Sequence, residues 1–229
     1  MQQDPARFGQ SSTTAGRPSA RELIATHRVL RNTYLLLAAT LLFSAAMAGV
    51  AMAINMPYLG PWVTLGGFFA LLFLTHATRN SAFGLVSVFA LTGFMGLTLG
   101  PILSFYLTGV PNGGQVIMSA LATTAIAFVG LSAYALASGR DFSFLRGFVL
   151  VGIVGLLGVI IASLLFDLSA YQAVISGAII LLMGALILFQ TGQIVHGGET
   201  NYISATVTLY VSIYNIFVSL LQLFGMSND

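Results

Sequence analysis

The chain has 229 residues, of which 57% are hydrophobic and only 6% are charged. A soluble domain cannot bury so large an apolar fraction, so the composition indicates an integral membrane protein. All eight basic residues are arginine and there is no cysteine, which excludes disulfides, thiolate metal ligands and thiol nucleophiles. The formal charge of +2 comes from arginines beside apolar segments, so we expect no nucleic-acid binding.

The N-terminal 20 residues are polar and rich in Ser, Thr, Gln and Gly, so we expect residues 1–20 to form a disordered cytoplasmic tail. They lack the apolar core of a signal peptide, so the first apolar segment should stay in the membrane. Residues 18–32 predict either a short interfacial helix, begun by a capping box of Ser19 and Glu22, or the lead-in turn of the first span.

Seven segments are apolar over the roughly 20 residues that a membrane-spanning helix needs. Together they predict an all-α membrane domain over residues 21–225, followed by an outward-facing tail at 226–229. The third span contains Gly100 and Pro101, and a proline inside a helix predicts a bend or an irregular end. The predicted spans are 33–54, 60–78, 81–107, 114–137, 148–166, 172–194 and 203–224.

The arginines set the orientation, because positively charged loops stay on the cytoplasmic side. If the N-terminus is cytoplasmic, seven spans place every arginine on the cytoplasmic side and leave the outward connections without a basic residue. The C-terminus then faces outward. The arginines concerned are Arg7, Arg17, Arg21, Arg28, Arg31, Arg79, Arg140 and Arg146.

Small residues recur at three- or four-residue spacing in several spans. In lipid such rows let helix backbones approach closely, so they predict the packing seams of a compact bundle. The rows are Thr40–Ser44–Ala48 and Ala45–Gly49–Ala53 in span 1, Thr92–Gly96–Gly100 in span 3, Ser119–Thr123–Ala127 in span 4, and Gly152–Gly155–Gly158 in span 5.

Polar residues line one straight face of the last span, because their steps of three and four residues follow the helical repeat. Unsatisfied polar groups are costly in hydrocarbon, so this face must turn inward, which predicts a central last helix enclosed by the other six. The residues are Ser204, Thr208, Ser212, Asn215, Ser219 and Gln222. A polar cluster at its cytoplasmic end should include Arg79, Gln190, Thr191 and Gln193.

This polar row has two interpretations that the residues leave open: hydrogen bonds between helices, or a narrow hydrated gate. No span has an Asp, Glu, Lys or Arg at its middle, where proton-coupled carriers usually have an ionisable group. Asp167 and Glu199 lie at opposite borders and cannot jointly chelate calcium. His27, His76 and His196 are isolated, so we expect no metal site, no cofactor and no enzymatic activity.

The segment "GGETNYISATVTLYVSIYNIF", together with "TGFMGLTLGPIL" in span 3, resembles the Bax inhibitor family of transmembrane proteins and its bacterial YccA-like branch. The resemblance covers roughly residues 25–225. Its signature residues here are Gly197, Gly198, Glu199, Thr200, Asn201 and Tyr202. It implies a seven-span fold in the bacterial cytoplasmic membrane.

The resemblance also implies two kinds of function. Some members resemble pH-gated calcium leaks that use two aspartates and an arginine. The aspartates fall here at Gln190 and Ser212, so both acids are absent, while Arg79 takes the place of the arginine. YccA-like members resemble modulators of a membrane-anchored ATP-dependent protease, which would grip residues 1–20. We expect this second function, with a calcium or cation leak channel and a small-solute transporter as alternatives.

Overall fold

The computed structural model describes residues 20–226, and its side chains from residue 26. This part of the chain forms seven long helices and one 3₁₀ turn, η1 (Ser169–Tyr171). The helices are α1 (Ala20–Ala53), α2 (Gly60–Thr78), α3 (Phe83–Gly109), α4 (Gly113–Ser138), α5 (Leu145–Leu165), α6 (Gln172–Val195) and α7 (Tyr202–Met226).

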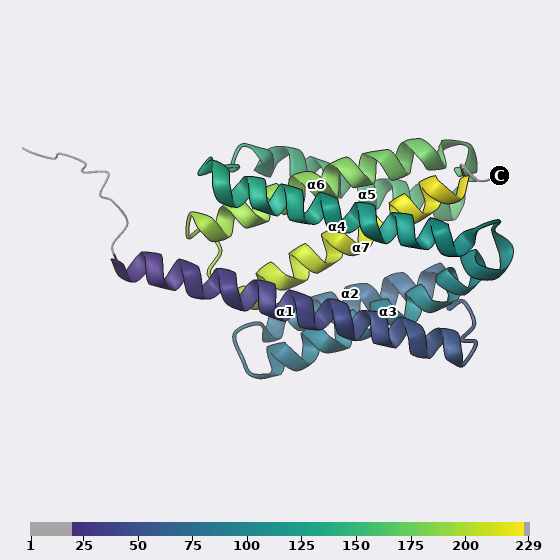
Figure 1. The fold of residues 1–229 in the computed structure, drawn as a ribbon, viewed down its shortest axis with the longest axis horizontal. Coiled ribbons are helices and arrows are strands. Elements are labelled where there is room, and N and C mark those ends of the chain that lie inside the picture. The colour runs from purple at the N-terminus through teal and green to yellow at the C-terminus, as the bar shows by residue number, and fades with distance from the viewer. Residues whose placement is uncertain (1–19, 227–229) are drawn as a thin grey trace, which may run out of the picture.

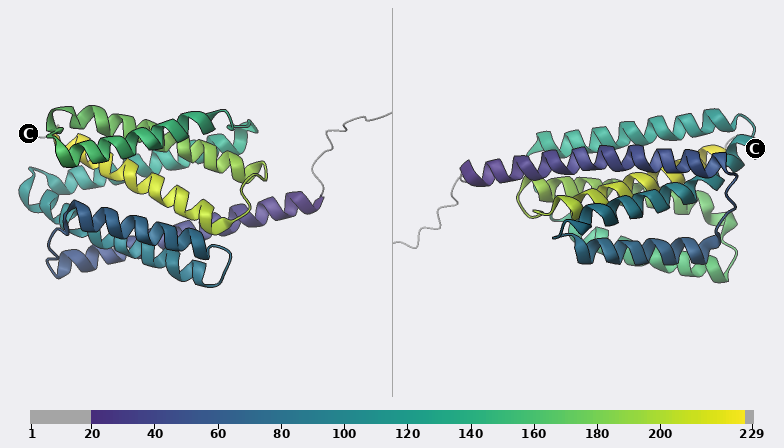
Figure 2. Two further views of the ribbon diagram at one scale, coloured as in Figure 1. Left: turned by 180° about the vertical axis from the view of Figure 1, so that it is seen from behind. Right: turned by 90° about the horizontal axis from the view of Figure 1, so that it is seen from below.

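The helices form two groups with α7 between them. Figure 1 shows α1, α2 and α3 on one side and α4, α5 and α6 on the other, with α7 running obliquely through the middle. The view from behind in Figure 2 shows the same order. Four helices, α1, α3, α4 and α6, pack directly on α7, while α2 packs on α3 and α5 on α6. The prediction of a central last helix is confirmed, although four helices and not six enclose it.

Seven helices in the described part of the chain are long and apolar enough to cross a membrane, which confirms the predicted number of spans. Most of the helix ends lie within three residues of the predicted ends. The start of α1 differs, because the helix runs without a break from Ala20 into the first span. The lead-in interpretation is therefore right and a separate interfacial helix is wrong. The proposed cap at Ser19, with most of the tail, lies outside the described residues.

Pro101 lies inside α3, and the helix continues beyond it to Gly109. Of the two expected outcomes, an irregular end near Gly100 is therefore wrong, and a bend at Gly100 and Pro101 stays a prediction. A proline in a spanning helix is tolerated because neighbouring helices and local adjustments satisfy the freed backbone groups. Gly100 itself packs so closely on α1 that an added Cβ would lie 2.5 Å from the Cβ of Ala51.

The predicted small-residue seams are real where α1 meets α3. Thr40, Ser44, Ala48 and Thr92 are buried, and an added Cβ on Gly96 would meet the backbone oxygen of Ser44. The other predicted rows of small residues do not all form packing seams. Ser119 and Thr123 on α4 are exposed, and nothing lies within 4 Å of a Cβ added at Gly49, Gly155 or Gly158. In α5 only Gly152 meets a neighbour, Leu182 of α6.

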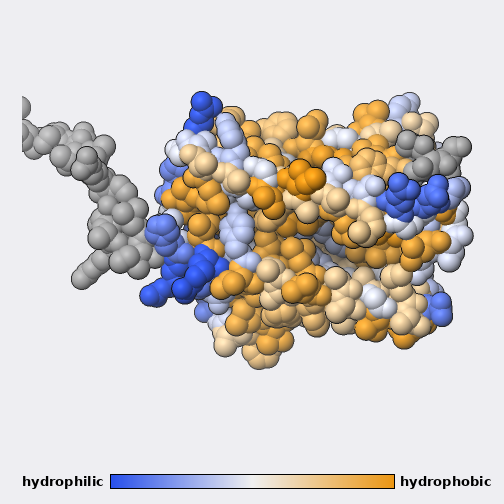
Figure 3. All heavy atoms as spheres, in the orientation of Figure 1, coloured by the Kyte–Doolittle hydropathy of each residue, from blue (hydrophilic) through white to orange (hydrophobic). Residues whose placement is uncertain are grey.

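The surface matches a protein immersed in lipid. Figure 3 shows hydrophobic residues along the flanks of the bundle and hydrophilic ones gathered towards its two ends. The start of α1, the α2–α3 connection, the α4–α5 connection and the α6–α7 connection lie at one end (Figure 1). We call this the arginine-rich end, because the five arginines whose side chains are described lie in these segments or directly beside them: Arg28, Arg31, Arg79, Arg140 and Arg146.

Candidate functional site

The α6–α7 connection has a defined structure that begins with a glycine cap on α6. Gly197 has a φ of +73°, the left-handed conformation that glycine adopts without strain. Its N–H donates to the carbonyl of Ile194 (3.2 Å), and the N–H of Gly198 donates to the carbonyl of Gln193 (2.8 Å). These two bonds define a Schellman motif, which satisfies carbonyls at the end of a helix. A Cβ added at Gly198 would meet the side-chain oxygen of Gln193, so that flexible side chain would have to shift.

The same connection ends with an N-cap on α7. The side-chain oxygen of Asn201 accepts hydrogen bonds from the N–H groups of Ile203 (3.0 Å) and Ser204 (3.1 Å). These are the N2 and N3 donors that an N-cap asparagine satisfies. Glu199 supports this turn, because its carboxylate accepts the N–H of Asn201 (2.8 Å).

Asn201 also joins this connection to the one between α2 and α3. Its side-chain amide donates to the carbonyl of Arg79 (3.1 Å) and to the side-chain oxygen of Asn80 (2.8 Å). Arg79 in turn donates from Nη1 to the hydroxyl of Ser204 (3.3 Å). We call Arg79, Asn80, Glu199, Asn201 and Ser204 the loop joint. It holds together two connections separated by about 120 residues.

Two cavities flank the loop joint, and Glu199 lines both. One of ≈ 240 Å³ lies between α2 and α7, and its lining includes Arg79, Ser204 and Thr208. The other, of ≈ 450 Å³, lies beside α6, and its lining includes Gln190, Gln193 and Arg146. The structure therefore separates the predicted polar cluster, because Arg79 lines the first cavity while Gln190 and Gln193 line the second.

The polar row of α7 bonds mostly within its own helix. The side chains of Thr208, Ser212 and Asn215 each donate to the carbonyl four residues earlier, at 2.8–3.1 Å. Bonds to other helices occur at its ends, where Ser204 meets Arg79 and Gln222 accepts from Ser176 of α6 (3.0 Å). Ser212 is fully buried, so the row is not exposed at this residue.

The opposite face of α7 carries hydrogen bonds between helices that the sequence did not predict. Tyr210 is 1% exposed, and its hydroxyl lies 2.6 Å from that of Ser44 on α1. It also donates to the carbonyl of Thr92 on α3 (3.3 Å). The hydroxyl of Tyr214 lies 3.4 Å from that of Thr98 on α3. These tyrosines therefore bind α7 to the α1–α3 pair.

Two of the three predicted site residues on α6 have a buried polar atom without a hydrogen-bond partner. Gln190 is 7% exposed and Thr191 is fully buried, and the amide nitrogen of the first and the hydroxyl of the second have no hydrogen-bond partner in the described part of the chain. Gln193 is bonded, since its amide donates to the hydroxyl of Ser143 (3.2 Å) in the α4–α5 connection. In that connection, hydrogen bonds from Ser143 lower the pKa of Asp141.

Residues 26–226 contain no group of three or more His, Asp or Glu side chains placed to hold a metal ion. Of the signature residues, Gly197, Gly198, Glu199 and Asn201 shape the α6–α7 connection, Thr200 is exposed, and the carbonyl of Tyr202 accepts from Thr206. Sequence reasoning missed these cap roles. The signal was a glycine directly after one apolar run and an asparagine directly before the next.

Comparison with known proteins decides the family. The model of the family described as "Inhibitor of apoptosis-promoting Bax1" matches residues 26–229. The chain belongs to the Bax inhibitor family. Its membership agrees with the seven-helix fold and confirms the resemblance seen in the sequence.

Bacterial relatives in this family match along nearly their whole length. An uncharacterized Pseudomonas aeruginosa protein is 58% identical over 199 residues, which cover 87% of this chain and 89% of the relative. "Modulator of FtsH protease YccA" of Escherichia coli K12 is 48% identical over 206 residues, or 90% and 93% of the two chains. An Escherichia coli relative with the same identity and coverage is called "Inner membrane protein YccA". This chain is likewise a multi-pass protein of the bacterial inner membrane.

Proposed function

We propose that this protein modulates a membrane-anchored protease of the FtsH type by binding to it, and that it does so without catalysis. The observation that carries the proposal is the 48% identity, over 93% of its length, to the relative named as a modulator of FtsH protease. A match of that extent covers most of the helical bundle and not one local motif.

The geometry of α7 supports binding over conduction. The family resemblance placed an acidic pair at Gln190 and Ser212, and neither side chain is ionisable. Ser212 is fully buried and donates its hydroxyl to its own helix, so its side chain is not exposed to a passing ion. The calcium-leak alternative therefore has no titratable group at these two positions.

Affinity purification tests the proposed partner. The full chain would be purified from native membranes in mild detergent, and the proteins that remain bound would be identified by mass spectrometry. We expect the FtsH-type protease among them in amounts that follow those of the bait. An unrelated multi-pass protein, expressed at the same level, serves as the control. Absence of the protease under conditions that preserve its own assembly would contradict the proposal.

Residues 1–20 are the proposed handle for the protease, because their polar composition is typical of segments that an ATP-dependent protease can grip. Deleting residues 2–19 should lengthen the half-life of this protein or abolish its effect on the protease while α1–α7 stay folded. A matched control replaces the same residues by a scrambled sequence of equal length. An unchanged half-life together with an unchanged effect on other substrates would count against the handle.

A further inference from the structure

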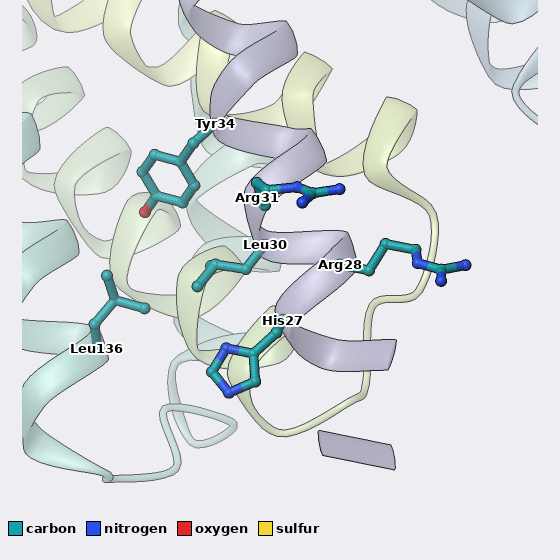
Figure 4. A pocket seen from close by; sticks show the side chains of 6 residues that line it. All are labelled: His27, Arg28, Leu30, Arg31, Tyr34 and Leu136. Carbon is teal, nitrogen blue, oxygen red and sulfur yellow. The ribbon is translucent and has the colours of Figure 1, made fainter. Parts of the chain in front are cut away.

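Two cavities at opposite ends of the bundle differ in how their linings are arranged. One of ≈ 680 Å³ lies at the arginine-rich end between α1 and the last turns of α4. Figure 4 shows both of its arginines extending away from the side of α1 that Tyr34 and Leu136 share, so its charged and apolar groups do not face a common ligand. The other, of ≈ 400 Å³, is lined jointly by α5, α6, α7 and the α5–α6 connection. We call it the α5–α6 cavity.

The rim of the α5–α6 cavity favours a cation. Among the described lining residues Asp167, in the α5–α6 connection, is the one acid, and none is basic. Hydrogen bonds from the backbone N–H (3.0 Å) and the hydroxyl of Ser169 lower the pKa of Asp167, so its carboxylate is ionised at neutral pH. The described arginines and histidines lie towards the other end of the bundle, and Asp167 forms no ion pair with a described residue. A positively charged ligand group would therefore meet a carboxylate that no described side chain neutralises.

The wall that α7 contributes to this cavity carries a free hydrogen-bond donor. Gln222 lines the cavity, and its side-chain oxygen accepts a hydrogen bond from the buried hydroxyl of Ser176 on α6 (3.0 Å). The amide nitrogen of Gln222 donates to no residue within 26–226. Because an unmade hydrogen bond is costly in apolar surroundings, this nitrogen favours a ligand that presents an acceptor beside it.

The residue numbering places these groups in order of depth. α6 runs inward from Gln172 at the rim, so Ser176, and with it Gln222, lies about 6 Å deeper at about 1.5 Å per residue. The apolar lining continues further inward. Ile179 lies about 10 Å below Gln172 on α6, and Leu156 lies about 13 Å before the end of α5. Passing inward from the rim, a ligand meets a carboxylate, then an amide donor, then apolar side chains.

A glycerophospholipid with an ammonium head group presents the complementary order. Its ammonium group is outermost, its phosphate and ester oxygens accept hydrogen bonds, and its acyl chains are apolar. Surrounding lipid reaches this part of the bundle, because Ile161 and Leu165 on the outer half of α5 are 59% and 72% exposed. An anionic lipid has no cation for the rim and would bring its negative charge to Asp167.

We propose that the α5–α6 cavity binds one phospholipid with a primary ammonium head group, such as phosphatidylethanolamine, from the leaflet at this end. The ammonium group lies against Asp167, and a phosphate or ester oxygen accepts from the amide nitrogen of Gln222. One acyl chain follows Leu156 and Ile179 into the bilayer. A soluble amine would use the rim alone and would leave the amide donor and the apolar lining without a ligand.

Competition between two lipids tests the charge selection. The purified full chain would be equilibrated with equal amounts of phosphatidylethanolamine and phosphatidylglycerol, and native mass spectrometry would measure the ratio of the two bound lipids. We expect the parent protein to prefer phosphatidylethanolamine, and Asp167→Asn to reduce this preference roughly threefold. Asp141→Asn at the arginine-rich end is the matched control and should leave the preference unchanged, because the Asp141 carboxylate accepts the N–H of Ser143 (2.9 Å) in the same kind of turn. No preference in the parent protein, or an equal change in both variants, would overturn the proposal.

Filling the apolar part of the cavity tests the lipid assignment without changing charge. Val159 lines the cavity, so Val159→Trp should reduce bound phosphatidylethanolamine. Val154→Trp should not, because Val154 is 61% exposed on α5 and does not line the cavity. Retained binding in the Val159 variant would contradict the proposal. Ethanolamine supplies a third arm: if it raises the thermal midpoint as much as phosphatidylethanolamine does, the ligand is a soluble cation and the lipid assignment is wrong.

Discussion

Asn201 shows how a single side chain stabilises this bundle at its arginine-rich end. Its oxygen caps α7, and its amide group holds the backbone at Arg79 and the side chain of Asn80. Asn201 thus satisfies backbone N–H groups at the start of α7 and also holds the α6–α7 connection against the α2–α3 connection. The sequence alone did not reveal this structural role of Asn201.

Two substitutions separate the role of Asn201 as the cap of α7 from its hydrogen bonds to the α2–α3 connection. Asn201→Asp keeps an acceptor for the α7 cap but loses the amide donor to Arg79 and Asn80, whereas Asn201→Ala loses both. We expect Asn201→Ala to lower the free energy of unfolding by about 1–2 kcal/mol, the usual cost of a lost N-cap plus the bonds between connections. Asn201→Asp should cost less. Thermal unfolding in mild detergent measures both, and equal stability of all three proteins would contradict this role.

Substitutions at Ser212 and Gln190 test whether the polar row of α7 serves helix packing or forms a path for ions. Introducing Ser212→Asp with Gln190→Asp places two carboxylates in buried positions, and a charge at mid-membrane costs about 2.5–3.5 kcal/mol on insertion scales. We expect a less stable protein and no calcium flux in liposomes from either the parent or the variant. Robust flux through the parent protein would instead favour the channel alternative.

At the scale of helices, the sequence predicted the elements well and their contacts less well. Apolar length is a direct physical requirement of the bilayer, so all seven spans could be placed from hydropathy. The seams could not all be placed, because small residues lie on several faces of α4 and α5. Gly155 and Gly158 have the spacing of a seam, yet nothing lies within 4 Å of a Cβ added to either. Spacing shows which residues share a face but not which face meets a neighbour.

The close contact between α1 and α3 at Gly96 leads to a prediction about stability. A Cβ added at Gly96 would collide with the backbone oxygen of Ser44, so the two helices must move apart. Gly96→Ala should destabilise the bundle by about 1–3 kcal/mol, the usual cost of overpacking. Gly155→Ala on α5 is the matched control, because its added methyl group meets open space. Similar unfolding midpoints for the two variants would show that the α1–α3 contact is looser than described.

For the whole molecule, the arrangement of ends supports one orientation. The described arginines lie at one end of the bundle, and the C-terminal end of α7 lies at the other (Figure 1). The sequence predicted this arrangement because the arginines precede the first span or lie in every second connection, which is on the same side of the membrane. The candidate site was predictable only in part. Its members were identified as polar residues near one membrane border, but their division into two cavities depends on how α7 crosses the bundle.

Reporter fusions test the orientation. A reporter after Asp229 and one after Arg140, which lies in the α4–α5 connection, should report opposite sides of the membrane. The Arg140 fusion should be cytoplasmic, as the positive charge predicts. Both reporters on the same side would contradict a seven-span topology.

Protease modulation by this protein is tested most directly by reconstitution. The purified FtsH-type protease and a membrane-protein substrate would be placed in liposomes with increasing amounts of the full chain, and the rate of substrate degradation would be measured. An unrelated seven-span protein at equal density controls for crowding. We predict that this protein changes the degradation rate in a saturable manner near equimolar amounts, while the control does not. A rate that stays unchanged at about tenfold molar excess would contradict the proposed function.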